Sequence, residues 1–169
     1  LPLIVAGDSA GGNLAAVAAR KARDAGGPVL TQQVLIYPVT QPDLATQGYQ
    51  DPANQGLLSQ DDMIWFWNSY VPDTAQRKDP DVSPLLAKNL SNLPPAVVIT
   101  AEHDVLSDEG AAYARQLEGA GVPVVYRQCQ GQIHGFFTIL NALPESKPAR
   151  EFVVSEIGRA IRESKTANA

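Results

Sequence analysis

The sequence has little of several residue types, and each scarcity excludes a class of protein. Its 169 residues contain one cysteine, Cys129, so no internal disulfide can form. No apolar run approaches the roughly 20 residues of a transmembrane helix, and no run of basic residues occurs. The formal charge of −5 at pH 7 argues against nucleic acid or an anionic membrane as a partner. A lone cysteine also fits a reducing compartment, so we expect a cytoplasmic protein.

Hydrophobic residues make up 44% of the chain, enough for one domain with a sizeable core. Short apolar runs that predict strands stand at residues 3–6, 34–37, 96–100 and 124–126. Runs without alternation are typical of strands buried on both faces of a sheet, and we expect this of residues 3–6. The last run alternates more than the others, so we expect it nearer an edge.

Helical segments separate these runs. One begins after Ser9 and is stopped by Gly-Gly-Pro at residues 26–28, another begins at residues 107–109, and a last one opens at Pro148. A loop is expected at residues 131–137. Strands and helices in alternation predict an α/β fold, with a parallel sheet covered by helices.

Residues 39–95 interrupt this alternation. The segment is rich in turn residues, and Ser-Gln-Asp-Asp at residues 59–62 indicates a capping box that opens a helix. Met63, Trp67 and Tyr70 follow at helical spacing, a pattern more typical of plain core than of a ligand pocket. We interpret residues 39–95 as an excursion over the sheet within one domain of residues 1–169.

Residues 7–11 read Gly-Asp-Ser-Ala-Gly, a match to the G-x-S-x-G pattern of a nucleophile elbow. Any glycine-rich turn between a strand and a helix can produce this pattern, but here it has the flanking strand and helix that the catalytic motif requires. A serine at such a turn has strained backbone, and we expect Gly7 and Gly11 to remove Cβ atoms that would collide there. The Ser9 hydroxyl would lie at a helix N-terminus, which favours developing negative charge.

Two further polar residues follow the carboxyl ends of predicted strands, where the reactive groups of a parallel sheet collect. Asp104 follows the third strand and His134 lies after the fourth. The order Ser9, Asp104, His134 is that of the catalytic triad in α/β-hydrolases. A serine hydroxyl is a poor nucleophile, so His134 would accept its proton and Asp104 would orient the imidazole. Asp108 is a rival acid, although a place in the first turn of the next helix explains it better.

Together these motifs resemble those of the bacterial hormone-sensitive lipase-like esterases, a family with the α/β-hydrolase fold. The resemblance rests on residues 7–13, 104–110 and 134–136, with further likeness at residues 79–85 and 93–96. It implies a serine carboxylesterase that hydrolyses short- to medium-chain acyl esters through an acyl-enzyme intermediate, without metal or cofactor. By position, Ser9 is the nucleophile, Asp104 the acid, His134 the base, and the Ala10 N–H an oxyanion donor.

The sequence departs from that family before the nucleophile. The family's other oxyanion donors come from a His-Gly-Gly-Gly stretch far upstream, whereas only one predicted strand precedes Ser9 here. We therefore expect residues 1–169 to be the C-terminal half of an enzyme, with about four of the family's strands and an upstream half of the same protein as partner. A homodimer is another way to cover the sheet edge at residues 3–6.

Two other functions share these residues. A non-catalytic small-molecule-binding protein on the same fold is one, although relatives of that kind have lost triad residues that are present here. A peptidase or thioesterase is the other, with the same triad and a different leaving group. For any of these, we expect Met63, Ile64 and Trp67 to wall a substrate pocket, because the excursion lies between strands whose carboxyl ends face the site.

Overall fold

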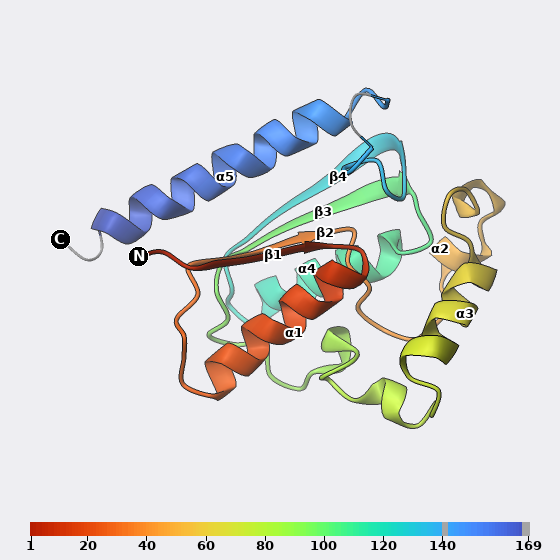
Figure 1. Cartoon of the computed structure of the whole chain (residues 1–169), viewed down its shortest axis with the longest axis horizontal. Coiled ribbons are helices and arrows are strands. Elements are labelled where there is room, and N and C mark those ends of the chain that lie inside the picture. The colour runs from red at the N-terminus through yellow and green to blue at the C-terminus, as the bar shows by residue number, and fades with distance from the viewer. Residues whose placement is uncertain (140–141, 167–169) are drawn as a thin grey trace.

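The computed structural model describes residues 1–139 and 142–166, whose strands form one four-stranded parallel sheet (Figure 1). Strands β1 (Ile4–Asp8), β2 (Gln32–Ile36), β3 (Ala96–His103) and β4 (Val124–Ile133) lie in the order β1-β2-β3-β4. Every neighbouring pair is parallel. The α/β fold that the alternation of apolar runs and helical segments predicted is therefore confirmed.

Helices cover both faces of the sheet. α1 (Ala10–Asp24) and α4 (Ser107–Gly119) pack on one face, whereas α5 (Ser146–Thr166), which begins two residues before its predicted start, crosses the other (Figure 1). In β2, Leu35 joins the core cluster under α1 and α4, and Val34 joins the cluster under α5. Both faces of this central strand are thus buried, which explains its continuous apolar run. In the part of the chain that the structure describes, no helix has the length and apolar character needed to cross a membrane.

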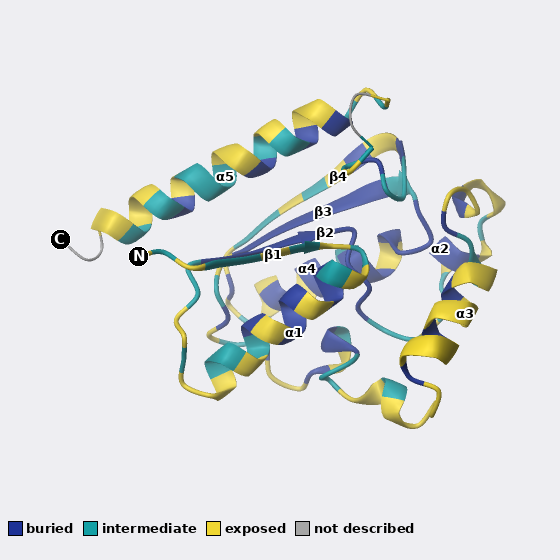
Figure 2. Cartoon of the chain, viewed as in Figure 1, coloured by how far each residue is buried: buried dark blue, intermediate teal, exposed yellow. Residues whose placement is uncertain are grey.

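The first strand has an apolar run that predicts burial on both faces, but in residues 1–169 it forms the exposed sheet edge that is expected when the family's upstream strands are absent. β1 lies at an edge of the described sheet, and all its residues are half-buried or exposed, whereas β2 is buried throughout (Figure 2). The difference arises because β1 has a hydrogen-bonded neighbour on one side only. Leu3, directly before the strand, is likewise exposed.

β4 extends to Ile133, well beyond the strand predicted at residues 124–126, so the loop after it starts later than expected. Its last part contains a β-bulge, in which residues 130–132 lie opposite the single residue Glu102 of β3. The Glu102 carboxylate accepts a hydrogen bond from the Gly131 N–H at 2.6 Å. A bulge bends a strand and redirects the residues after it, and the first residue after β4 is the candidate histidine, His134.

Between β2 and β3 the chain forms α2 (Gln47–Gln50), α3 (Gln60–Tyr70) and short 3₁₀ turns at Pro52–Asn54, Gln76–Lys78 and Pro84–Leu86. The predicted capping box opens α3: Ser59 Oγ accepts the Asp62 N–H at 3.2 Å, and the Asp62 carboxylate accepts the Ser59 N–H at 2.9 Å. α2 and α3 lie beyond the carboxyl ends of the strands, where the candidate site residues emerge (Figure 1).

Candidate active site

Ser9 occupies a sharp turn between β1 and α1. Its φ of 54° and ψ of −119° are strained for a residue other than glycine. The turn is fixed on both sides, because the Ser9 N–H donates to Ile36 O at 2.9 Å and the Asn13 N–H donates to Ser9 O at 3.1 Å. Ala10 is the first residue of α1, and the first N–H groups of a helix have no acceptor within it. The Ser9 hydroxyl therefore lies beside N–H groups that the helix itself does not use.

Two glycines around this turn lie so close to neighbouring atoms that a side chain would collide with them. A Cβ on Gly7 would lie 2.1 Å from the Gly11 carbonyl oxygen, so no side chain fits at that position. The same expectation for Gly11 is wrong, since the nearest atom to a Cβ there is Asp8 Oδ1 at 3.9 Å. The second close approach falls instead at Gly12, where a Cβ would lie 2.9 Å from the Pro38 Cβ.

The structure brings the three predicted triad residues together. Ser9 Oγ lies 2.9 Å from His134 Nε2, and His134 Nδ1 lies 2.7 Å from Asp104 Oδ2. The Asp104 side chain is 0% exposed and that of His134 is 11% exposed. The Leu106 N–H donates to Asp104 Oδ1 at 3.0 Å, which fixes the carboxylate. With the proton on Nδ1 donated to Asp104, Nε2 is free to accept the serine proton.

The rival acid Asp108 has a different position. It lies in the first turn of α4, as its place in the sequence predicted. Its Oδ2 accepts the Gly48 N–H at 2.6 Å, so Asp108 fastens α2 to α4. The carboxylate hydrogen-bonded to the imidazole is that of Asp104.

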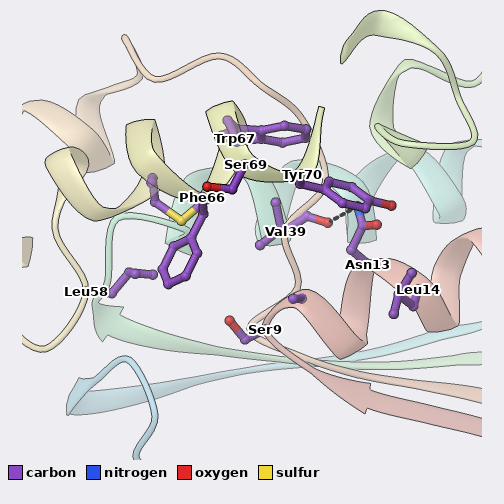
Figure 3. A pocket seen from close by; sticks show the side chains of 11 residues that line it. Ser9, Asn13, Leu14, Val39, Leu58, Phe66, Trp67, Ser69 and Tyr70 are labelled. Atoms are coloured by element: carbon purple, nitrogen blue, oxygen red, sulfur yellow. Dashed lines mark hydrogen bonds between the residues drawn. The ribbon is translucent and has the colours of Figure 1, made fainter. Parts of the chain in front are cut away.

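A cavity of about 460 Å³ opens beside Ser9 (Figure 3). Ser9 and α1 form one side, and side chains of α3 form the opposite side. Met63 and Trp67 are among the lining residues, whereas Ile64 is not and is 42% exposed. The lining also includes residues that were not expected there, namely Leu14, Val39, Leu58, Phe66, Ser69 and Tyr70. Tyr70 belongs to the helical stripe of Met63 and Trp67 that the sequence favoured as core. Phe66 lies three residues after Met63, so the same periodicity could have identified it.

Asn13, four residues after the serine, joins α1 to the excursion. Its side chain lines the cavity and is buried, with the residue 4% exposed. Nδ2 donates to Val39 O and to Val82 O, each at 2.8 Å (the contact with Val39 is drawn in Figure 3). One side chain thereby fastens two distant segments of residues 39–95 to the helix that begins beside Ser9.

Glu109 is a second polar group that the sequence did not single out. It is 1% exposed, and Oε1 accepts the Thr40 N–H at 2.6 Å and the Gln41 N–H at 3.3 Å. Burial raises the pKa of its carboxyl to about 8, the backbone hydrogen bonds lower it, and the nearby Asp104 charge raises it. Glu109 thus ties the start of the excursion to α4, directly behind the triad acid.

Other reactive side chains lie away from this cavity. Cys129 is buried, and burial raises the pKa of its thiol. His103 at the end of β3 is partly exposed, with Nε2 3.8 Å from the Glu102 carboxylate. Within residues 1–139 and 142–166, no group of three or more histidine, cysteine, aspartate or glutamate side chains is arranged to hold a metal ion.

Residues 2–138 match a family described as the alpha/beta hydrolase fold. The chain belongs to this α/β-hydrolase family. Over 162 residues it is 39% identical to the carboxylesterase NlhH of Mycobacterium tuberculosis, which covers 94% of this chain and 51% of that protein. It is 38% identical over 158 residues to the ethyl acetate hydrolase of Pseudomonas putida, covering 92% and 49% of the two chains.

Solved structures of esterases have the same fold as this α/β-hydrolase chain. A fungal esterase from Rhizomucor miehei is 41% identical with a TM-score of 0.90, over 95% of this chain and 50% of that one. A thermostable esterase from Pseudomonas putida is 46% identical with a TM-score of 0.84, over 87% and 47%. The chain spans about half the length of the curated relatives it matches.

Proposed function

We propose that residues 1–169 are the C-terminal half of a serine carboxylesterase, in which Ser9 is the nucleophile, His134 the base and Asp104 the orienting acid. The observation that carries this proposal is the unbroken hydrogen-bonded series Ser9–His134–Asp104 beside a cavity. It is supported by the strained elbow that presents the serine and by relatives that are named as ester hydrolases.

The reaction follows from these positions. Ser9 Oγ attacks the ester carbonyl carbon while His134 Nε2 accepts its proton, and buried Asp104 stabilises the imidazolium. The Ala10 N–H, at the start of α1, donates to the oxyanion of the tetrahedral intermediate. Collapse of that intermediate expels the alcohol, which takes the proton from His134 and leaves an acyl-enzyme on Ser9. Water, deprotonated by the same imidazole, then hydrolyses the acyl-enzyme.

The remainder of the active site is assigned to the upstream half of the same protein. It would supply further oxyanion donors and cover β1, while residues 39–95 act as the excursion over the site. Support comes from the half-length match to each relative and from the exposure of apolar Leu3 and Leu14. Each ~100 Å² of apolar surface that the upstream half covers contributes about 2.5 kcal/mol.

The substrate class proposed is an ester with a short- to medium-chain acyl group. The cavity beside Ser9 measures about 460 Å³, and most of its lining side chains are apolar or aromatic. Walls of this kind bind alkyl or aryl groups and exclude water from the acyl-enzyme. The unpaired Cys129 is compatible with the cytoplasmic location expected for the enzyme.

The test uses the complete enzyme with Ser9→Ala and, as a matched control, Ser69→Ala. Ser69 also lines the cavity, but its hydroxyl donates to Trp65 O at 2.9 Å within α3. We expect Ser9→Ala to lower p-nitrophenyl butyrate hydrolysis at least ~10³-fold and Ser69→Ala to retain it. An organophosphonate probe should label Ser9, as read by peptide mass spectrometry.

Two results would contradict the proposal. Residual activity of Ser9→Ala above about a thousandth of wild type would remove the serine from the chemistry. Tight binding of small esters by the wild type without labelling or turnover would favour the non-catalytic small-molecule-binding protein. Faster turnover of thioesters or peptides than of oxygen esters would instead keep the triad and change the substrate class.

A further inference from the structure

Tyr37 is the first residue after β2, the strand that lies between β1 and β3. Its N–H donates to Ile99 O of β3 at 2.6 Å, and the preceding carbonyl, Ile36 O, accepts the Ser9 N–H at 2.9 Å. The backbone at Tyr37 is therefore fastened on one side to the strand that leads to Asp104 and on the other to the nucleophile turn. The residue is 1% exposed.

The backbone conformation of Tyr37 is unfavourable for its side chain. Its φ of 35° lies in the left-handed region, which a bulky residue adopts only under strain and which glycine adopts freely. Strain of this kind persists where the surrounding hydrogen bonds over-determine the conformation, and it clusters at functional sites. A tyrosine in this position indicates that the ring makes a contact that glycine could not.

That contact is with His134. The Tyr37 and imidazole ring centroids are 4.5 Å apart with the planes tilted by 52°. The Phe136 ring packs edge-on against Tyr37 from 5.9 Å and holds it in place. Ser9 and Asp104 bind the two imidazole nitrogens, and the Tyr37 ring lies against the same imidazole.

We propose that Tyr37 is a positioning residue for His134, whose aromatic ring fixes the imidazole between Ser9 and Asp104 and stabilises the imidazolium formed during acyl transfer. The inference rests on the proposed triad function. An aromatic ring carries negative potential on its face, which attracts a cation held against it. Burial raises the pKa of the Tyr37 hydroxyl to about 12, so the phenol stays neutral through the working range of an esterase.

Other charged groups also act on this pair of rings. Titratable groups on the neighbouring elements include Asp8 at the end of β1, Glu102 and His103 at the end of β3, Asp104 after β3, and Glu109 on α4. The core cluster that contains Tyr37 also includes residues of β4 and α5, and with them come the charges of Arg127, Glu145 and Arg150. The Arg150 guanidinium donates to Phe137 O at 2.9 Å. Asp8 and Asp104 are the charges that act on the Tyr37 hydroxyl. All of them are retained when only the Tyr37 ring is changed, so the difference between variants reports the ring.

The experiment replaces Tyr37 in the complete enzyme by Phe, by ring-fluorinated phenylalanines and by Leu. Fluorination keeps the shape of the ring and weakens its negative face, whereas Leu removes the ring. kcat/KM for p-nitrophenyl butyrate and the rate of organophosphonate labelling of Ser9 are measured between about pH 5 and pH 9. Tyr113→Phe and its fluorinated counterparts are the controls, because Tyr113 is buried on α4 in the cluster on the opposite face.

We expect Tyr37→Phe to stay within about two-fold of wild type, since it keeps the ring. The fluorinated variants and Tyr37→Leu should lower the high-pH plateau about three- to ten-fold and move the midpoint of the acidic limb down by about half a pH unit. The direction follows because a ring that stabilises the imidazolium less makes the base lose its proton at lower pH. The Tyr113 controls should leave both plateau and midpoint unchanged.

An unmoved midpoint throughout the fluorinated series would overturn the inference, whatever the activity of Tyr37→Leu, because mere packing depends on shape alone. An equal loss in Tyr37→Phe would assign the effect to the hydroxyl and overturn it as well. A wild-type enzyme that is not labelled at Ser9 would overturn the proposed function first. A wild type that is labelled at Ser9, together with fluorinated variants that keep the wild-type midpoint, would overturn the role of Tyr37 alone.

Discussion

On the sheet side of Ser9, the side chains of Asp104 and His134 are 0% and 11% exposed and are joined by one hydrogen bond of 2.7 Å beyond the carboxyl ends of the strands. On the other side, α3 leaves Trp65, Phe66 and Tyr70 between 48% and 64% exposed. The first side is an extension of the sheet core, whereas the second is a separate small cluster around Met63 and Trp67.

Side-chain hydrogen bonds connect the two sides. Asn13 and Glu109 bind backbone atoms of the excursion, and Asp108 binds α2 at Gly48. The triad and the segment 39–95 therefore pack separately, and a few side-chain hydrogen bonds connect them. Substitutions in the triad should lower the rate of the chemical step. Substitutions of the connecting residues Asn13, Asp108 and Glu109 should affect stability, and substitutions on α3 should change substrate preference.

The largest difference in effect is expected between substitutions of Asp104 and of Asp108. We expect Asp104→Asn in the complete enzyme to lower kcat about 10³- to 10⁴-fold, because the amide favours the wrong imidazole tautomer. Asp108→Asn should leave kcat within a few-fold and lower stability by about 1 kcal/mol. The amide oxygen can still accept the Gly48 N–H, and only the negative charge of the acceptor is lost. Steady-state kinetics and urea unfolding measure both. Equal losses of kcat would overturn the assignment of the acid.

The contact of Glu109 with the backbone of residues 40 and 41 should make stability depend on pH. Its pKa is about 8 in the folded protein against 4.5 for the free group, so the folded state binds more protons between these values. Stability should therefore fall as pH rises through this window, by up to about 5 kcal/mol, and then level off.

Glu109→Gln removes this titration and keeps an amide oxygen for the Thr40 N–H. We expect its urea midpoint to change less between about pH 5 and pH 8.5 than that of wild type. Glu118→Gln, on an exposed position of the same helix, is the control and should keep the wild-type slope. Identical slopes for Glu109→Gln and wild type would show that Glu109 is not the group responsible.

The hydrogen bonds of Asn13 to Val39 O and Val82 O should contribute to stability independently of pH, because an amide does not titrate. Asn13→Ala leaves the carbonyls of Val39 and Val82 without this donor, and an unsatisfied buried acceptor costs about 1–3 kcal/mol. We expect a loss of about 2–4 kcal/mol in urea unfolding, with Asn68→Ala on the exposed face of α3 as a near-neutral control. A loss below about 0.5 kcal/mol would mean that water replaces the donor and that other contacts hold residues 39–95.

Sequence reasoning predicted the sheet side better than the segment 39–95. The elbow, Asp104 and His134 each follow the end of an apolar strand, and parallel strands bring their carboxyl ends to one edge whatever the intervening loops do. The requirement for glycine at position 12 was missed, because it depends on Pro38, which is distant in sequence. β1 is less buried than its apolar run suggests for a related reason, since the run records what a strand can bury and not which neighbours are present.

The contacts of single side chains between distant segments were missed because no local sequence pattern identifies them. Glu109 is a glutamate in the first turn of a helix, a position that is usually solvated. Its burial arises only when residues 40 and 41 return over α4. Tyr37 resembles one more apolar residue at the end of β2, and neither its left-handed backbone nor its contact with His134 has a sequence signal. Tertiary contacts of single side chains decide such positions.

The smallest effect is expected on α3, where two adjacent aromatic residues separate pocket lining from surface. Phe66 lines the cavity and is 48% exposed, whereas Trp65 is 64% exposed and does not line it. Neither is fully buried, so truncation of either should leave the fold intact, unlike truncation of Trp67 at 2% exposed. Phe66→Ala enlarges the cavity beside Ser9 and should shift the kcat/KM ratio of p-nitrophenyl octanoate to butyrate toward octanoate by about three- to ten-fold. Trp65→Ala should leave that ratio unchanged. An unchanged ratio in Phe66→Ala would place the acyl chain outside this cavity and return α3 to a purely structural role.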